Sequence, residues 1–230
     1  MIRLHEFNTK WWGHPVGIVD DGAFFSLSPE AQQEALAPFH WVEYKAPLHE
    51  APLLDMQRAG FFLSDVQEQF RIKLSCEEGS FLEPLNVCFA DAKPLELTDE
   101  SFAAFEHERF QHLPGCSKER LRSRYGPWAR QMIREHPETC LAVLANGAIQ
   151  GWFLSHPVSN GLNLALAMNH RDARISGFLV YQKGLSAYAA RGYRIGGASF
   201  SVTNTAVHNI YCRLGAQFVA PTGIWLKIMR

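Results

Sequence analysis

The sequence predicts an α/β (α+β) fold built on a mixed central sheet, and three features of its second half support this. Three apolar runs are separated by Asn146-Gly147 and by the polar stretch 155–161, which is typical of an antiparallel meander. A helical pattern then joins two strands over residues 162–202, and such a crossover makes those two strands parallel. Two more apolar strands close the chain. Antiparallel and parallel pairs together give a mixed sheet.

The first half of the chain contains a helix followed by a strand. Leu53, Leu54 and Met56 have the spacing of an apolar helix face, and Gly60 ends the helix. Residues 67–74, which alternate between polar and apolar side chains, then predict a strand.

A looser stretch follows over residues 75–97, with three Gly or Pro residues in it. This composition favours a connection between domains. We therefore predict an N-terminal domain over residues 1–97 and a second domain over residues 98–230.

The second domain opens with two predicted helices. Thr98 precedes the apolar positions Phe102, Phe105 and Phe110 in the way that an N-cap precedes the first turns of a helix. Another helix is predicted over residues 118–136. The strands of the meander are then expected at 140–145, 148–155 and 162–168.

The crossover helix begins near Gly177 and ends at Gly192, after about four turns. The remaining elements are a strand at 194–202, a helix beginning after Asn204, and strands at 216–220 and 223–229. One strand of this sheet should splay from its neighbour near residue 168. Backbone groups would be free there for a ligand, and the crossover helix points its N-terminus at the same place.

Charge and composition narrow the class of ligand. The 230 residues include 22 Lys and Arg against 23 Asp and Glu, without a basic run, so we expect no nucleic-acid partner. Charges and histidines interrupt the apolar residues near the N-terminus, so we expect no signal peptide and no membrane partner, and a cytoplasmic location. The five cysteines lack CxxC spacing, and no metal site is expected. The remaining ligand class is a small molecule.

The closing helix carries the motif that is most informative about function. Asn204, Ala206 and Tyr211, followed by "RLGAQF", resemble the pattern of the GCN5-related N-acetyltransferase (GNAT) superfamily. The resemblance implies the GNAT fold, with acetyl-CoA or another acyl-CoA bound beside the splayed strand. A narrower likeness, at low identity, is to the bacterial dTDP-fucosamine acetyltransferases, in which a partial GNAT-like N-terminal domain precedes a complete one.

The phosphate-binding loop of that family has two alternative frames in this sequence. "DARISG" over residues 172–177 matches the family pattern only at Gly177, whereas "RISGFL" over residues 174–179 matches at Arg174 and Gly177. In both frames Ile175 and Ser176 supply backbone N–H groups for a pyrophosphate. Ile175 does not readily adopt a positive φ, so we expect either weaker coenzyme A binding or an acyl donor on a carrier protein.

Tyr211 has two alternative roles. Direct acyl transfer needs a nucleophilic amine, backbone N–H groups that hold the oxyanion, and a proton for the departing thiolate. Tyr211 shares a helix face with Val207, Ile210 and Leu214, which by spacing alone indicates packing. The resemblance implies instead that the Tyr211 hydroxyl is the general acid.

The resemblance also implies binding roles for three further residues. Asn204 is a good N-cap, and its side chain would also contact the pantetheine arm. Backbone groups of Ala167 and Met168, at the end of the splayed strand, would pair with the pantetheine amides and hold the thioester carbonyl. His156 and His170 lie in loops beside the predicted cleft, as candidates for a general base or as solvated loop histidines.

The resulting prediction is an N-acyltransferase that moves an acetyl or other acyl group from acyl-CoA to a primary amine. The acceptor would be a small molecule, such as a nucleotide-linked amino sugar, and transfer would be direct, in a ternary complex. Two alternatives stay open: an acyl carrier protein as donor, or a non-catalytic GNAT-like binding module. The oligomeric state is also open, with a homodimer as one alternative.

Overall fold

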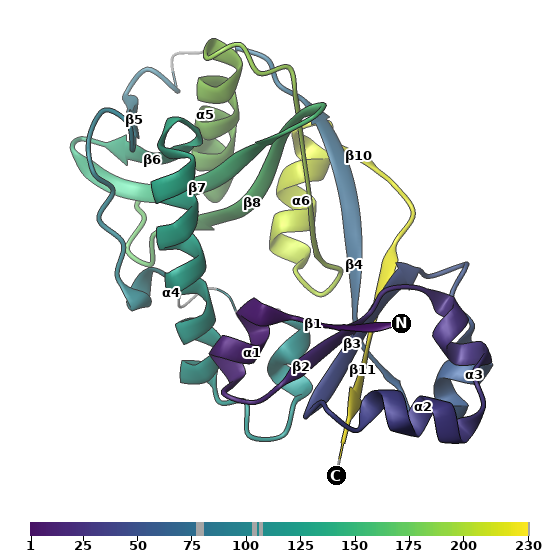
Figure 1. Ribbon diagram of the computed structural model, residues 1–230. Coiled ribbons are helices and arrows are strands. Elements are labelled where there is room, and N and C mark those ends of the chain that lie inside the picture. The colour runs from purple at the N-terminus through teal and green to yellow at the C-terminus, as the bar shows by residue number, and fades with distance from the viewer. Residues whose placement is uncertain (77–80, 103–104, 106–107, 230) are drawn as a thin grey trace. The chain divides into compact units, whose positions relative to one another are not determined.

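The computed structural model describes residues 1–76, 81–102, 105 and 108–229 (Figure 1). The chain forms two compact units, whose ranges interleave along the sequence. The first unit comprises residues 1–68, 107–117 and 220–230, and the second comprises residues 69–106 and 118–219. Residue 97 lies inside the second unit, and the division into domains 1–97 and 98–230 stays a prediction.

In the first unit the strands pair in the order β1, β2, β3, β11 and β4. Only β2 and β3 are parallel in this order, and the other neighbours are antiparallel. The strands are β1 (Ile2–Leu4), β2 (Val16–Val19), β3 (Trp41–Pro47), β11 (Thr222–Ile228) and the first part of β4 (Phe62–Lys73). The helices are α1 (Glu6–Trp12), α2 (Pro29–Leu36) and α3 (Leu53–Arg58), with 3-10 turns η1 (Gly22–Ser26) and η3 (Arg109–His112).

The helix and strand predicted in the first half are confirmed as α3 and β4, with two differences. Met56 is 1% exposed, whereas Leu53 and Leu54 are 52% and 70% exposed, so only Met56 belongs to the core. Gly60 ends the helix with φ +77°, and β4 begins at Phe62 rather than at residue 67. The apolar spacing located the helix correctly but did not reveal which side chains it buries.

A buried ion pair fastens η3 to β3 in the first unit. The Arg109 Nε donates to Glu43 Oε2 at 2.6 Å, and Lys45 Nζ lies 3.3 Å from the other oxygen of Glu43. The Glu43 side chain is 1% exposed. Burial alone would raise the pKa of Glu43, but the charges of Arg109 and Lys45 together lower it to about 2. Ser64 adds a hydrogen bond from its hydroxyl to the Arg109 carbonyl.

In the second unit the strands pair in the order β4, β9, β8, β7, β6 and β5, and β10 pairs with β4. Their bounds are β5 (Leu85–Phe89), β6 (Cys140–Ala145), β7 (Ala148–Val158), β8 (Gly161–Asn169), β9 (Ile195–Ser201) and β10 (Gln217–Phe218). The predicted antiparallel meander is confirmed as β6, β7 and β8. Asn146 and Gly147 have φ of +50° and +79°, the two positive values that a type I′ hairpin turn requires.

The helices of the second unit are α4 (Lys118–Glu135), α5 (Gly177–Ala190) and α6 (Thr205–Arg213), with 3-10 turns η2 (Asp99–Phe102) and η4 (Pro137–Thr139). α4 packs against one face of the meander, and α5 and α6 pack against the other (Figure 1). Alternate residues of β6 and β7 enter the two cores, as the strand repeat requires.

The α-helix predicted over residues 98–110 differs from what the structure describes. Its described part forms η2 and η3, and residues 103–104 and 106–107 lie outside the described residues. The Thr98 amide donates to the Ser101 hydroxyl at 3.2 Å, and the Ser101 amide donates to the Thr98 carbonyl at 3.0 Å. A backbone bond between residues three apart is that of a 3-10 turn rather than of an α-helix.

None of the described helices is both long enough and apolar enough to span a bilayer. A search of the same residues finds no group of three or more His, Cys, Asp or Glu side chains that could hold a metal ion.

Candidate active site

The two parallel strands β8 and β9 pair over a short stretch and then separate. Their described pairs are Leu162 with Gly196 and Asn163 with Gly197, although β8 continues to Asn169. The separation begins at a β-bulge, because Leu154 of β7 pairs with Leu166 while His156 pairs with Asn163. One residue of β7 therefore faces two of β8, and such a bulge bends the strand that contains the extra residue. The predicted splayed strand is thus present, but it leaves its neighbour after Asn163 rather than near residue 168.

Beyond the bulge, the backbone N–H and C=O groups of alternate β8 residues face the gap between β8 and β9. The Met168 carbonyl faces β7, because it lies 2.5 Å from where a Cβ on Gly151 would stand. The His170 amide also faces β7 and donates to the Gln150 carbonyl at 2.8 Å. Strand alternation therefore turns the polar groups of Ala167 away from β7. The Ala167 carbonyl accepts a hydrogen bond from the Tyr181 hydroxyl at 3.2 Å.

The loop before α5 satisfies some of its own amides and leaves others available. The Arg174 amide donates to Gln150 Oε1 at 2.8 Å, and the Ala173 amide donates to the His170 carbonyl at 3.0 Å. Within the described part of the chain, the amides of Ile175, Ser176 and Gly177 have no hydrogen-bond partner. The Ser176 hydroxyl caps α5 by accepting from the Phe178 amide at 3.3 Å. Three adjacent amides at the start of a 14-residue helix suit a phosphate group.

Two arginines flank these amides with different surroundings. Arg171 Nη1 donates to Glu100 at 2.8 Å, so its charge is already paired. The exposed Arg174 has no ion-pair partner among the described residues. Arg174 is therefore the cation that this loop can offer to an anionic ligand.

Asn169 is a candidate binding residue that the sequence patterns did not indicate. Its Oδ1 is buried without a hydrogen-bond partner in the described structure, at the end of β8. A Cβ on Gly177 would stand 2.5 Å from Asn169 Nδ2, so only glycine leaves this amide in place. A buried acceptor without a partner beside three available amides fits the amide and phosphate groups of an acyl-CoA. Its one signal in the sequence is an amide side chain directly before the loop.

The predicted helix after Asn204 is confirmed as α6. Asn204 is its N-cap, and its Oδ1 accepts from the Val207 amide at 3.2 Å. Val207, Ile210 and Leu214 pack against the core of the second unit, on the face where Tyr211 is buried. The shared face predicted from spacing is therefore confirmed.

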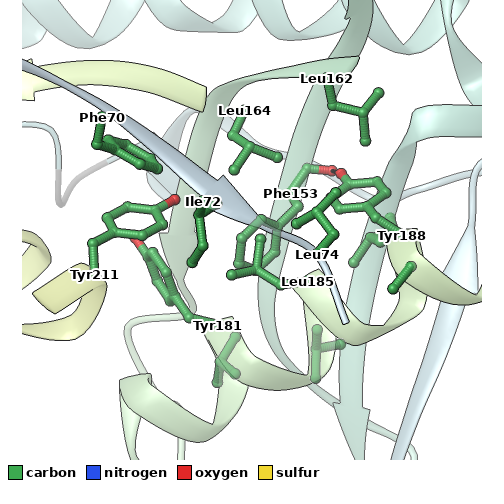
Figure 2. Close-up of a cluster of buried hydrophobic side chains, with 14 residues drawn as sticks. Phe70, Ile72, Leu74, Phe153, Leu162, Leu164, Tyr181, Leu185, Tyr188 and Tyr211 are labelled. Carbon is green, nitrogen blue, oxygen red and sulfur yellow. Dashed lines mark hydrogen bonds between the residues drawn. The ribbon is translucent and has the colours of Figure 1, made fainter. Parts of the chain in front are cut away.

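Tyr211 lies between Phe70 and Tyr181 (Figure 2). Its ring centroid is 3.9 Å from that of Phe70 and 5.5 Å from that of Tyr181, and the residue is 2% exposed. Burial, with smaller contributions from Tyr181 and Tyr188, raises the pKa of Tyr211 well above 10. The hydroxyl therefore keeps its proton at neutral pH.

The two histidines considered as general bases have different surroundings. His156 Nε2 lies 3.3 Å from Asn163 Nδ2, and burial together with nearby His136 lowers the pKa of His156. His170 packs its ring 5.4 Å from that of Trp152, and its Nδ1 accepts from the Asp172 amide at 3.1 Å. His156 thus lies in β7, opposite Asn163 of β8, rather than in a loop as predicted, and His170 is engaged within the loop.

Solved structures with the same arrangement of strands and helices identify the fold. A GCN5-related N-acetyltransferase from Sphaerobacter thermophilus superposes with a TM-score of 0.60 at 18% identity, over 87% of this chain and 65% of its own. The chain has the GNAT fold. It spans about two thirds of that protein's length.

Two further structures agree with this GNAT fold. A GCN5-related N-acetyltransferase from Kribbella flavida gives a TM-score of 0.57 at 12% identity, over 93% of this chain and 81% of its own. A tandem GNAT protein from the clavulanic acid biosynthesis pathway gives 0.55 at 13% identity, over 94% and 76%. No protein-family model and no curated protein matches the sequence. At these identities the likeness establishes the fold alone.

Proposed function

We propose that the protein is an N-acyltransferase that moves an acetyl or other acyl group from an acyl-CoA to a primary amine. The observation that supports this most is the separation of β8 from β9 after Asn163 and Gly197, with the start of α5 beyond the free edge of β8. This arrangement offers backbone groups to an extended ligand and amides to its phosphates.

The residues of the second unit have distinct binding roles in this proposal. The amides of Ile175, Ser176 and Gly177, together with the Arg174 guanidinium, hold the pyrophosphate. Asn169 Oδ1 accepts a hydrogen bond from an N–H group of the pantetheine arm. Asn204 contacts the same arm while it caps α6.

The backbone assignment differs in one respect from the sequence-based one. Both Ala167 and Met168 were expected to face the ligand, but the Met168 carbonyl faces β7. Ala167 is therefore the residue whose N–H we assign to the oxyanion of the thioester carbonyl. The Tyr181 hydroxyl donates to the Ala167 carbonyl and does not contact the Ala167 amide. This hydrogen bond can therefore remain while the amide binds the oxyanion.

The proposed reaction is a direct transfer. The amine nitrogen attacks the thioester carbonyl carbon, the new N–C bond forms, and the C–S bond breaks. The sulfur receives the proton of the Tyr211 hydroxyl, the attacking nitrogen loses a proton to water, and Tyr211 regains a proton from water before the next turnover. The high pKa of Tyr211 keeps that proton available until the thiolate forms.

Arg174 gives the first test of the donor site. Wild-type protein should gain thermal stability with millimolar acetyl-CoA, and Arg174→Ala should lose most of this gain, because a charge-assisted contact to phosphate is removed. Differential scanning fluorimetry measures both. Arg134→Ala is the matched control, because Arg134 is 73% exposed on α4 and should leave the gain unchanged. An equal gain in all three proteins would contradict the assignment of Arg174.

A substitution at Gly177 tests the backbone amides of the same donor site. Gly177→Ala should weaken acetyl-CoA binding by about tenfold or more, because the added Cβ displaces Asn169 and crowds the amides. Gly192→Ala is the control at the other end of α5: its φ of +92° adds backbone strain that Gly177→Ala lacks, but no atom lies within 4 Å of its Cβ position. Isothermal titration calorimetry gives both dissociation constants, and equal weakening in the two variants would reject the local role of Gly177.

A non-catalytic GNAT-like module is the second candidate function. It is favoured by the close packing of Phe70 on Tyr211, with ring centroids 3.9 Å apart and exposures of 3% and 2%. A side chain buried in this way is what a purely structural role of Tyr211 in the core would also produce. The absence of stabilisation by acetyl-CoA, by longer acyl-CoA and by an acylated carrier protein would support this candidate. Stabilisation by the carrier protein alone would assign the donor to it.

A further inference from the structure

The second unit contains a cavity of about 620 Å³ at the paired ends of β8 and β9. Its walls come from β4, β8, β9 and the turn between β7 and β8. Leu162, Asn163, Gly196 and Gly197 line it, and these are the residues that pair the two strands before they separate. The cavity therefore lies at the closed end of the gap in which we place the acyl donor.

Phe70 is both a lining residue of this cavity and a neighbour of the proposed acid, Tyr211. Phe70 lines the cavity and stacks on Tyr211 with ring centroids 3.9 Å apart. For direct transfer, the attacking amine must approach the thioester from a side that the donor does not fill, and this cavity offers such an approach.

The cavity has one charged side chain, Arg71, among its described lining residues. Its guanidinium has no ion-pair partner in the part of the chain that the structure describes. Arg71 Cγ lies 4.0 Å from where a Cβ on Gly197 would stand, so the absence of a side chain there leaves room for the arginine stem. A planar guanidinium without a partner matches a carboxylate or a phosphate.

Asn163 supplies a second recognition group in the same cavity. Its Nδ2 donates to His156 Nε2 at 3.3 Å, which requires that nitrogen of His156 to be unprotonated. Burial and His136 lower the pKa of His156, which favours this neutral form. With Nδ2 so engaged, the Asn163 carbonyl oxygen is left to accept from an N–H group of a ligand. His156 is in this sense a positioning residue for Asn163.

We infer that this cavity binds the acyl acceptor, and that the acceptor is an amine with one anionic group, recognised by Arg71 at the anion and by Asn163 at the amine. The assignment of the ligand as the acyl acceptor rests on the proposed function, whereas the anion-binding site at Arg71 does not depend on it. The anion is a carboxylate or a phosphate, and the two are distinguished by the choice of probe.

A binding measurement with anionic amines tests the proposed anion site and does not require enzymatic turnover. Calorimetric titration uses two matched pairs of probes: glucosamine 6-phosphate against glucosamine, and glycine against glycinamide. The wild-type protein should bind the member that carries the anionic group at least about tenfold more tightly than the member that lacks it, in one of the two pairs. The pair that shows the preference identifies phosphate or carboxylate. Equal binding within both pairs, or none, would overturn the inference.

Variants on one strand then assign the preference to a residue. Arg71→Gln should remove it, and Arg71→Lys should restore part of it. Lys73→Gln is the control, because Lys73 is exposed two residues along β4 and does not line the cavity. A preference that persists in Arg71→Gln, or that Lys73→Gln removes equally, would refute the role of Arg71.

The same proteins separate this inference from the proposed function. If Arg71-dependent binding is found but acetyl-CoA neither binds nor donates its acyl group, the anion site stands and the acyltransferase proposal fails. If transfer occurs and Arg71→Gln leaves the KM for every anionic amine unchanged, the acyltransferase proposal stands and the anion site fails. With transfer present, Arg71→Gln should raise the KM for the anionic amine about tenfold with little change in kcat.

Discussion

Replacing Tyr211 with phenylalanine is expected to lower kcat by about 10²- to 10⁴-fold, the usual contribution of a positioned general acid. The thermal stabilisation by acetyl-CoA should remain, because the hydroxyl is assigned to the departing sulfur and not to donor binding. Initial rates with a thiol-detecting reagent give kcat, and calorimetry gives the dissociation constant of the donor. The raised pKa of Tyr211 also predicts that kcat does not fall between about pH 7 and 9 through loss of this proton.

Tyr188→Phe is the matched control for this experiment. Tyr188 is another fully buried tyrosine of the same core, and its hydroxyl donates to the Thr139 carbonyl at 2.8 Å (Figure 2). Its loss should lower the free energy of unfolding by about 1 kcal/mol and leave kcat within a few-fold. If Tyr211→Phe behaves in the same way as Tyr188→Phe, then Tyr211 is a packing residue.

Removing the cation from the buried pair of the first unit should destabilise the protein strongly. Arg109→Met removes the closest cation from Glu43, which is 1% exposed and keeps Lys45 at 3.3 Å, and breaking such a pair costs about 3–5 kcal/mol. Urea unfolding followed by tryptophan fluorescence measures the change. Arg58→Met is the control, because the Arg58–Asp55 pair is exposed and should contribute no more than about 0.5 kcal/mol. Similar losses in the two variants would contradict the role of the buried pair.

The same pair predicts the direction of the pH dependence. Since the folded pKa of Glu43 is about 2 against an ordinary 4.5, the unfolded state binds this proton first. The stability from the pair is present above pH 4.5 and is lost as the pH falls from there toward 2, by about 3 kcal/mol in total. The difference between wild type and Arg109→Met should therefore narrow over this range. A constant difference would mean that Glu43 does not titrate as the geometry implies.

Local patterns predicted most of the second unit correctly. The Asn146-Gly147 turn requires two positive φ values, which these residues adopt easily, so the meander around it could be predicted from sequence. The cap at Asn204 and the apolar face that includes Tyr211 depend on contacts three or four residues apart. Such short-range interactions can be predicted from the sequence because the residues that make them are close together along the chain.

Predictions failed where a distant segment decides the outcome. Leu53 and Leu54 have helical spacing, but they are exposed, because the burial of a helix face depends on which distant segments pack against it. The described residues after Thr98 form 3-10 turns, which the helical spacing of Phe102, Phe105 and Phe110 does not indicate. No local pattern indicates that Arg109 meets Glu43, which is 66 residues away.

The sequence by itself determined the order of strands and helices from α4 to β11, the α6 motif of Asn204 and Tyr211, and the glycine at the start of α5. Each of these follows from backbone preference or side-chain spacing within a few residues. Only the tertiary structure decided that β8 leaves β9 after Asn163 and that Ala167, rather than Met168, faces the gap. It also placed Arg71 in the cavity beside Phe70. These outcomes depend on the register between strands, and register is set by packing across the whole sheet.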